Sequence, residues 1–195
     1  MKVSGSPWPC SVTFETGTGV ISRATAHYQK RLSDLRGLFL DPAALEQRIR
    51  EEADPVCYEN YAFKQSQAEG DIFFGTTTIY PGKVGLEYHL TRGHYHRKRN
   101  HAETYQALSG HGLVLFERAD GRTRTAELAP GKVTYIAPFW AHRSINTSDV
   151  PLVFLWTCSI EAGHDYEGLG DTGMRQVVVE RNGVPSIEDR PPRSV

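Results

Sequence analysis

The histidines of this chain gather in one stretch, because seven of the eight lie between residues 89 and 164. His94 and His96 are two residues apart, and in a strand such residues point to the same side. Both imidazoles can then reach one metal ion. An isolated pair of this kind is more often a surface or hydrogen-bonded pair, so the prediction of a metal site needs further ligands.

Two later residues can complete the set. Glu103 is the first carboxylate after the histidine pair. If residues 94–96 and 103–108 form a hairpin, Glu103 lies beside the two imidazoles. His142 ends the sequence Pro-Phe-Trp-Ala-His after a predicted strand, and it is the best candidate for a fourth ligand.

Three imidazoles and one carboxylate form a mixed nitrogen and oxygen ligand set. Such a set suits Fe²⁺, Mn²⁺, Ni²⁺, Co²⁺ or Zn²⁺, and it leaves one or two positions open for a substrate. Nothing in the spacing selects among these metals. We expect His101 to be solvated, and His89 and His111 to be packing or surface groups.

The surrounding sequence is typical of an all-β domain. From about residue 71, short apolar or alternating runs are separated by turn pairs such as Asp120-Gly121 and Asn182-Gly183. This spacing of strands and turns predicts a sandwich or barrel. The predicted strands are 72–80, 86–90, 103–108, 113–117, 123–128, 133–136, 144–146, 152–159 and 174–180.

Residues 1–70 read differently and are predicted to form an N-terminal extension. Asp41-Pro42 followed by residues 43–52 indicates a short helix, because Asp is a good N-cap and proline is tolerated at the first helical position. Residues 11–15 could form a strand, and the mixed periodicity of residues 23–40 leaves them unassigned. We therefore expect a single domain over 1–195, with the extension over 1–70, a barrel core over 71–187 and a tail over 188–195.

The composition excludes several classes of protein. The chain has 22 basic and 23 acidic residues and a formal net charge of -1, so we expect neither nucleic acid nor a membrane as partner. An anionic ligand must therefore be met by a local site. No apolar run approaches the ~20 residues of a membrane span, and residues 1–10 lack the apolar segment of a secretory signal. Three widely spaced cysteines indicate reduced thiols in a cytoplasmic protein.

The residues around the four candidate metal ligands resemble the two motifs of the cupin superfamily. Residues 93–110 contain Gly-His-Tyr-His, a glutamate after six more residues and a glycine after a further six. Residues 131–146 carry glycine, proline, histidine and asparagine at the spacing of the second motif. The gap between His96 and Glu103 is longer than in the commonest cupins, and Trp140 stands where many have glycine. Both features resemble the cupin-type phosphoglucose isomerases, as do residues 76–85, 135–143 and 162–166, and the resemblance covers roughly residues 50 to 190.

The resemblance implies a jelly-roll barrel, a homodimer and the interconversion of glucose 6-phosphate with fructose 6-phosphate. It implies one divalent ion per subunit, with Fe²⁺ or Mn²⁺ expected before Ni²⁺, Co²⁺ or Zn²⁺. The phosphate would be held by Thr77, Thr91 and Gly93, with Arg92 able to add charge. A tyrosine of the N-terminal region would approach it, Tyr58 rather than Tyr61, and Phe139 is given no role. The remaining implied residues are Tyr105, His164 and Tyr166 near the sugar or phosphate, and His94, His96, Glu103 and His142 as metal ligands.

Aldose–ketose isomerisation moves a hydrogen between C1 and C2, either by proton removal through an enediol or by a direct hydride shift. Glu103 is the nearest carboxylate to act as base, and whether it is base, ligand or both stays open; His142 is the second expected catalytic residue. Activity on mannose 6-phosphate also stays open. Two other functions remain, a dioxygenase on the same barrel and a non-catalytic sugar-phosphate-binding protein. The threonine and tyrosine set is not needed for oxygen chemistry, and a pure binder has little need for Glu103.

Overall fold

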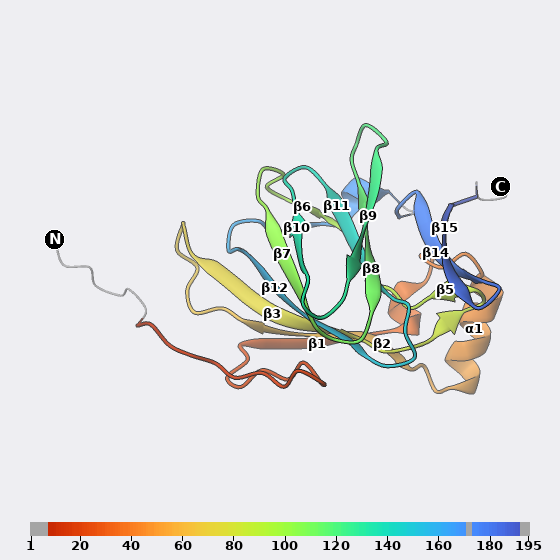
Figure 1. Cartoon of the computed structure of the whole chain (residues 1–195), viewed down its shortest axis with the longest axis horizontal. Helices are drawn as coiled ribbons and strands as arrows, with labels where there is room; N and C mark the ends of the chain where they lie inside the picture. Colours follow the sequence, from red (N-terminus) through yellow and green to blue (C-terminus); the bar gives the residue numbers. More distant parts are fainter. Residues whose placement is uncertain (1–7, 171–172, 192–195) are drawn as a thin grey trace.

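The computed structural model describes residues 8–170 and 173–191, and strands dominate it (Figure 1). Within these residues no helix is both long enough and apolar enough to cross a membrane. The first half contains β1 (Ala26–Arg31), the 3-10 helix η1 (Leu32–Leu35), α1 (Pro42–Glu51), β2 (Val56–Phe63), β3 (Ile72–Ile79), β4 (Lys83–Val84), β5 (Glu87–Tyr88) and β6 (Tyr95–His96). The second half contains β7 (Glu103–Ser109), β8 (Gly112–Glu117), β9 (Thr123–Leu128), β10 (Val133–Ile136), β11 (Ala141–Asn146), β12 (Leu152–Ser159), β13 (His164–Asp165), the 3-10 helix η2 (Glu167–Leu169), β14 (Gln176–Arg181) and β15 (Val184–Asp189).

The strand order is that of a jelly roll. One sheet has the antiparallel order β1-β2-β3-β12-β7-β10, and the facing sheet has the order β11-β8-β9. Bridges from Leu90 to Ile145 and from His94 to His142 add the chain around residues 90–94 beside β11. Strands β3-β12-β7-β10 therefore face a second group of four, as in a double-sheet jelly roll. The all-β fold class predicted from the sequence is confirmed.

Several element boundaries differ from the prediction. Residues 144–146 are only the end of β11, and residues 11–15 contain an isolated bridge, Phe14 to Ile21, in place of a strand. Strand β15 reaches Asp189, so little of the predicted tail follows it; residues 192–195 lie outside the described residues.

The N-terminal extension contributes two strands to the main sheet. β1 pairs with β2, and β2 pairs with β3 from Tyr58 opposite Ile79 to Phe63 opposite Phe74. The sheet is therefore continuous across position 70. The predicted helix is present as α1, where the Asp41 carboxylate accepts a hydrogen bond from the Ala44 backbone N–H at 2.9 Å. Such a cap contributes about 1 kcal/mol to helix stability.

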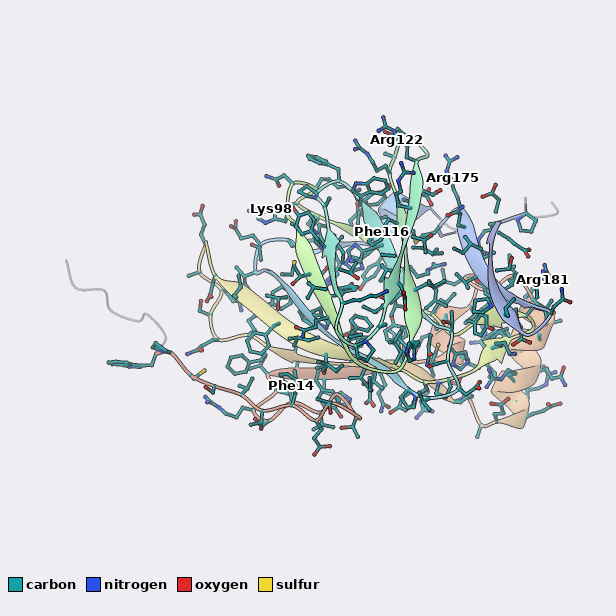
Figure 2. The ribbon with its side chains drawn as sticks, in the orientation of Figure 1. Phe14, Lys98, Phe116, Arg122, Arg175 and Arg181 are labelled. Carbon is teal, nitrogen blue, oxygen red and sulfur yellow. The ribbon has the colours of Figure 1, made fainter. Side chains whose placement is uncertain are left out.

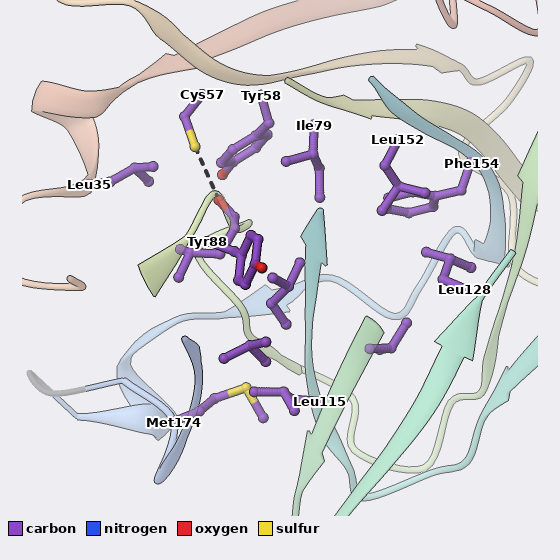
Figure 3. Packing of buried hydrophobic residues seen from close by; sticks show 14 of the residues in the cluster. Leu35, Cys57, Tyr58, Ile79, Tyr88, Leu115, Leu128, Leu152, Phe154 and Met174 are labelled. Carbon is purple, nitrogen blue, oxygen red and sulfur yellow. Dashed lines mark hydrogen bonds between the residues drawn. The ribbon is translucent and has the colours of Figure 1, made fainter. Parts of the chain in front are cut away.

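The core lies between the two sheets and under α1. Leu128, Leu152 and Phe154 pack together at one end of the barrel, and Cys57 donates from its thiol to the Leu90 carbonyl near the other (Figure 3). Phe116 lies inside the barrel, whereas charged side chains such as Arg122 point out from the hairpin turns (Figure 2). The three cysteines are free thiols, as the sequence predicted.

A buried histidine joins α1 to the barrel. His89 is 2% exposed, its Nδ1 donates to the Tyr80 carbonyl at 3.1 Å, and its Nε2 accepts from the Arg48 guanidinium at 2.9 Å. This arrangement requires the neutral imidazole with the proton on Nδ1. The prediction that His89 is a packing group is consistent with these contacts, and the burial of His89 ties the stability of the fold to pH.

We expect acid to destabilise the protein through His89. Burial, with a smaller effect of the Arg48 charge, lowers the pKa of His89 from 6.5 to about 4. The unfolded chain therefore takes up this proton at a higher pH than the native protein, and stability falls as the pH drops from about 6.5 to about 4. The loss is about 3 kcal/mol, measurable by urea unfolding at several pH values. In His89→Gln this part of the pH dependence is expected to vanish, and an unchanged slope would contradict the assignment.

Candidate active site

A cavity of about 140 Å³ lies inside the barrel between the two sheets. Side chains from both sheets and from the N-terminal strands line it. It brings together every residue that the sequence analysis placed in the site: Tyr58, Thr77, Thr91, Gly93, His94, His96, Glu103, Tyr105, His142, His164 and Tyr166.

The four predicted metal ligands converge at one point of this cavity. Each of His94, His96, Glu103 and His142 offers one ligand atom, and these atoms lie within 4.8 Å of one another. One carboxylate oxygen of Glu103 is 3.1 Å from Nε2 of His96 and 3.1 Å from Nε2 of His142. The ring centroids of His94 and His142 are 4.4 Å apart.

The predicted hairpin is wrong, although Glu103 does lie beside the histidines. β6 pairs with β13, whereas β7 pairs with β10 and β12 in the other sheet. The six residues between His96 and Glu103 carry the chain across the barrel, a span too long for a tight turn. Glu103 therefore reaches the imidazoles across the interior from the facing sheet.

The donor atoms suit a divalent cation. Nδ1 of His96 is 2.9 Å from the backbone carbonyl of His101 and donates to it, which leaves Nε2 as the ligand atom. His101 thus contributes its backbone, and its side chain is half-buried rather than solvated. Nε2 of His94 and Nδ1 of His142 are buried without a hydrogen-bond partner among the described residues, whereas Nε2 of His142 faces the Glu103 carboxylate. Leaving such an atom unsatisfied costs about 1–3 kcal/mol, and a metal ion would provide the missing partner.

The charges of the cluster also match a metal site. Burial alone would raise the pKa of Glu103, but the imidazoles of His142 and His96 lower it to about 2. Burial and the neighbouring histidines lower the pKa of His94 well below its usual value. The carboxylate is therefore ionised and the His94 imidazole neutral at neutral pH, which are the forms that bind metal.

A β-bulge forms the wall next to the cluster. The Thr91 N–H donates to the Ser144 carbonyl at 2.9 Å, and the His94 N–H donates to the His142 carbonyl at 3.2 Å. Two residues, at positions 92 and 93, therefore stand opposite Arg143 alone, which is the definition of a bulge. Gly93 has a φ of 75°, a backbone conformation that glycine adopts without strain.

Two hydroxyl groups beside the bulge are held with their protons available. Thr91 Oγ1 accepts from the Ser144 N–H at 3.1 Å, so its own proton is free to donate. Burial raises the pKa of the Tyr58 hydroxyl, and the Arg92 backbone N–H lies close enough to that hydroxyl to lower its pKa by a smaller amount. Both groups line the cavity, and their geometry suits the binding of an anion.

Only one of three consecutive threonines faces the cavity. Thr77 donates its hydroxyl proton to Asn60 Oδ1 at 2.5 Å, while Thr76 and Thr78 donate to the carbonyls of Gly19 and Thr18. Thr76 and Thr78 therefore hold the N-terminal loop, as the alternation of a strand requires.

The other predicted residues surround the cluster. Tyr105 lies in β7, and its ring is nearly perpendicular to that of His142, with the two ring centroids 5.6 Å apart. His164 and Tyr166 stack on each other at 5.8 Å at the exposed side of the cavity, and His164 lies 4.4 Å from His94. The guanidinium of Arg92 lies 4.7 Å from the Tyr166 ring. Tyr61 stacks on His27, Phe139 is exposed, and neither of these two aromatic residues lines the cavity.

Sequence reasoning missed several lining residues. Tyr28 and Asn60 face the cavity from β1 and β2, where they are register partners, and these strands were not predicted. Phe154, Trp156 and Cys158 line it from one face of β12. Their spacing of two residues was the signal that could have found them. The four lining residues that remain are Ala62, Phe73, Ala162 and Gly163.

Comparison with known proteins gives a consistent result. A family described as "Glucose-6-phosphate isomerase (GPI)" matches residues 29–192. A glucose-6-phosphate isomerase of Thermococcus litoralis is 45% identical over 183 residues, which cover 94% of this chain and 95% of that protein. One from Pyrococcus abyssi is 44% identical, with 94% and 96% covered. Among solved structures, Bacillus subtilis oxalate decarboxylase has a TM-score of 0.46 at 24% identity, over 55% of this chain and 27% of the other.

Proposed function

The chain belongs to the glucose-6-phosphate isomerase family, and from that premise we propose that its barrel cavity binds a hexose 6-phosphate beside a divalent metal ion. The protein is an aldose–ketose isomerase that interconverts glucose 6-phosphate and fructose 6-phosphate. In this proposal His94, His96, Glu103 and His142 hold the ion. The observation that carries it is the convergence of these four side chains next to a wall of hydrogen-bond donors.

The metal cluster and the donor wall have separate tasks. A bound divalent ion supplies Lewis-acid stabilisation for the negative charge that develops on the sugar oxygens at C1 and C2. Glu103 is the only carboxylate among the residues that line the cavity, so it is the candidate for moving the proton between these carbons. Its low pKa makes it a weak base, since the best general bases have a pKa near the working pH.

The phosphate would lie against the bulge. Thr91 and Tyr58 each offer a free hydroxyl proton, and Gly93 lets an anion approach its backbone because it has no side chain. Arg92 lies at the exposed side of the same wall and can add a positive charge. His164 and Tyr166 line the exposed side of the cavity next to Arg92 and would contact the sugar.

Asn60 decides how Thr77 can act. With Asn60 Oδ1 toward Thr77, the threonine proton is already donated and is unavailable to a phosphate. Rotation of the amide by a half turn places its NH₂ group toward Thr77 and frees that proton. The two orientations occupy nearly the same space and exchange the donor and acceptor ends of the amide, and we propose the second one for the substrate complex.

A coupled assay tests the function and the phosphate wall together. Protein loaded with Mn²⁺ or Fe²⁺ is expected to convert fructose 6-phosphate to glucose 6-phosphate, detected through a glucose-6-phosphate dehydrogenase. In Thr91→Val the KM is expected to rise about ten-fold or more, because one hydrogen bond to a charged group is lost. Thr91→Ser keeps the hydroxyl and serves as the matched control, with a KM close to that of the unaltered protein.

Three outcomes would contradict this proposal. Absence of turnover with metal bound would favour a non-catalytic sugar-phosphate binder. Oxygen uptake without isomerisation would favour the dioxygenase reading. A Thr91→Val variant with an unchanged KM would remove Thr91 from the phosphate site while leaving the isomerase activity in place.

The finer features of the enzyme belong to the same proposal. We propose Fe²⁺ or Mn²⁺ as the native ion, because the three-nitrogen, one-oxygen ligand set accommodates both. We also propose a homodimer that works in the cytoplasm, which the cupin resemblance and the free thiols support.

A further inference from the structure

Arg143 is a buried charge that the proposed reaction does not use. It lies in β11 next to His142 and is 1% exposed. Its Nη2 donates to the backbone carbonyl of Arg92 at 2.8 Å, while its Nε and Nη1 have no hydrogen-bond partner in the described part of the chain. Burying a guanidinium with so few partners is costly. The contact that Arg143 makes is with Arg92, in the wall of the cavity.

The contact with Arg92 fixes the orientation of one peptide group. No cis peptide bond occurs among the described residues, so the carbonyl of Arg92 and the N–H of Gly93 point in opposite directions. Because the carbonyl points to Arg143, the Gly93 N–H points away from it. Gly93 lines the cavity and Arg143 does not, so the N–H is turned toward the cavity.

Arg143 also packs directly under the glycine. A Cβ atom at Gly93 would lie 3.2 Å from both Cβ and Nε of Arg143 and 3.3 Å from the His142 carbonyl. The arginine therefore supports the bulge from behind, at the position where the bulged strand has two residues and β11 has one. The guanidinium, the Arg92–Gly93 peptide and the cavity follow one another in that order.

We propose that Arg143 is a positioning residue for the phosphate, acting through the Arg92–Gly93 peptide, which it orients and polarises so that the Gly93 N–H binds the anion. The inference rests on the proposed function, since it takes the anion to be the phosphate of the sugar. A cation at the carbonyl end of a peptide strengthens the hydrogen bond that its N–H donates. Arg143 thus gives the site positive character without occupying space in it.

The main competing explanation is that Arg143 only balances a buried negative charge. The carboxylate of Glu87, which is 1% exposed, is the opposite charge that acts most on Arg143. Arg190 provides a matched comparison, because its Nη2 lies 3.7 Å from the same carboxylate. Arg190 donates to the carbonyls of Leu38 and Met174, which lie outside the bulge. Loss of Arg190 therefore removes a charge beside the same carboxylate, while the hydrogen bond from Arg143 to the Arg92 carbonyl stays in place.

The experiment compares Arg143→Met with Arg190→Met in the Mn²⁺-loaded full-length protein. Two quantities are measured, the dissociation constant for inorganic phosphate by calorimetry and the kinetic constants for fructose 6-phosphate. In Arg143→Met we expect the phosphate constant and the KM each to rise about ten-fold, as for loss of charge assistance to one hydrogen bond. The kcat should stay within about three-fold, because the metal ligands are intact. In Arg190→Met only the melting temperature should fall.

A second variant covers the case in which Arg143→Met does not fold. The double variant Glu87→Gln with Arg143→Met removes both charges and leaves no unpaired carboxylate in the interior. It is expected to show the same ten-fold loss of phosphate affinity.

The possible outcomes separate this inference from the proposed function. Equal losses of phosphate affinity in Arg143→Met and Arg190→Met, or wild-type affinity in Arg143→Met, would overturn the positioning role. If the unaltered protein fails to isomerise but loses phosphate affinity only with Arg143, the proposed function falls and the inference stands. If the unaltered protein binds no phosphate, the inference is overturned.

Discussion

Treatment with a chelator is expected to lower the rate of fructose 6-phosphate isomerisation by roughly 10³-fold, since Lewis-acid stabilisation contributes several kcal/mol to the barrier. Within the described residues, Nε2 of His94 and Nδ1 of His142 are buried without a hydrogen-bond partner, and the ionised Glu103 lies 3.1 Å from Nε2 of His96 and of His142. These groups are arranged for a cation, and without it the carboxylate has only imidazoles to neutralise it. Addition of Mn²⁺ or Fe²⁺ should restore the rate.

The histidine variants give this prediction its control. His142→Ala is expected to lose activity to the same extent and to remain inactive when metal is added, because His142 is 1% exposed and faces the cluster. His111→Ala alters an exposed histidine away from the cavity and should behave as the unaltered protein. Metal analysis of each purified variant separates loss of the ion from loss of folding. Full activity after complete removal of metal would refute the metal site.

Replacement of Glu103 by glutamine is expected to lower kcat by about 10³-fold while the protein still binds its metal ion, because general base catalysis contributes 10²- to 10⁴-fold. Glutamine keeps the shape of the side chain and one carbonyl oxygen that can act as ligand, but it cannot take up a proton. The three histidines remain to hold the ion. The measurement is kcat together with the metal content of the same sample.

Glu103→Asp is the companion variant for this experiment. It keeps the carboxylate but shortens its reach, so it should retain metal and recover part of the lost rate. Near-normal turnover of Glu103→Gln with metal retained would remove Glu103 as the base and leave it as a ligand. If Glu103→Gln loses both its metal ion and its turnover, Glu103 is needed as a metal ligand. An exchange of the C2 hydrogen with solvent, measured in the unaltered protein, distinguishes proton removal from a hydride shift.

Features that depend only on residue type and on spacing within a short segment could be predicted from the sequence. His94 and His96 could be paired because a strand repeats every two residues, and α1 could be placed because Asp41 and Pro42 mark a helix start. The position of Glu103 beside the histidines could be anticipated from residue type and from the resemblance to one branch of the cupins. The all-β class followed from the regular spacing of strands and turn pairs, and the choice of a barrel followed from the resemblance.

The remainder depended on long-range pairing that no local pattern contains. β1 and β2 form because β3 offers a free edge, so Tyr28 and Asn60 reach the cavity from a segment that looked irregular. The hairpin between residues 94–96 and 103–108 was wrong for the same reason, because the two segments belong to facing sheets. The burial of Arg143, with two nitrogens that lack a hydrogen-bond partner among the described residues, also depends on the pairing of segments that are distant in the sequence.

The pairing of β2 with β3 determines the smallest segment of this enzyme that could be transferred with its cavity intact. Tyr58 and Asn60 enter the cavity from β2, and Thr76 and Thr78 anchor the loop that precedes β1. A designer who transplants residues 71–187 onto another scaffold would carry the four proposed metal ligands but would leave part of the cavity wall behind. The segment before residue 70 must be transferred together with the barrel, since both parts supply residues that line the cavity.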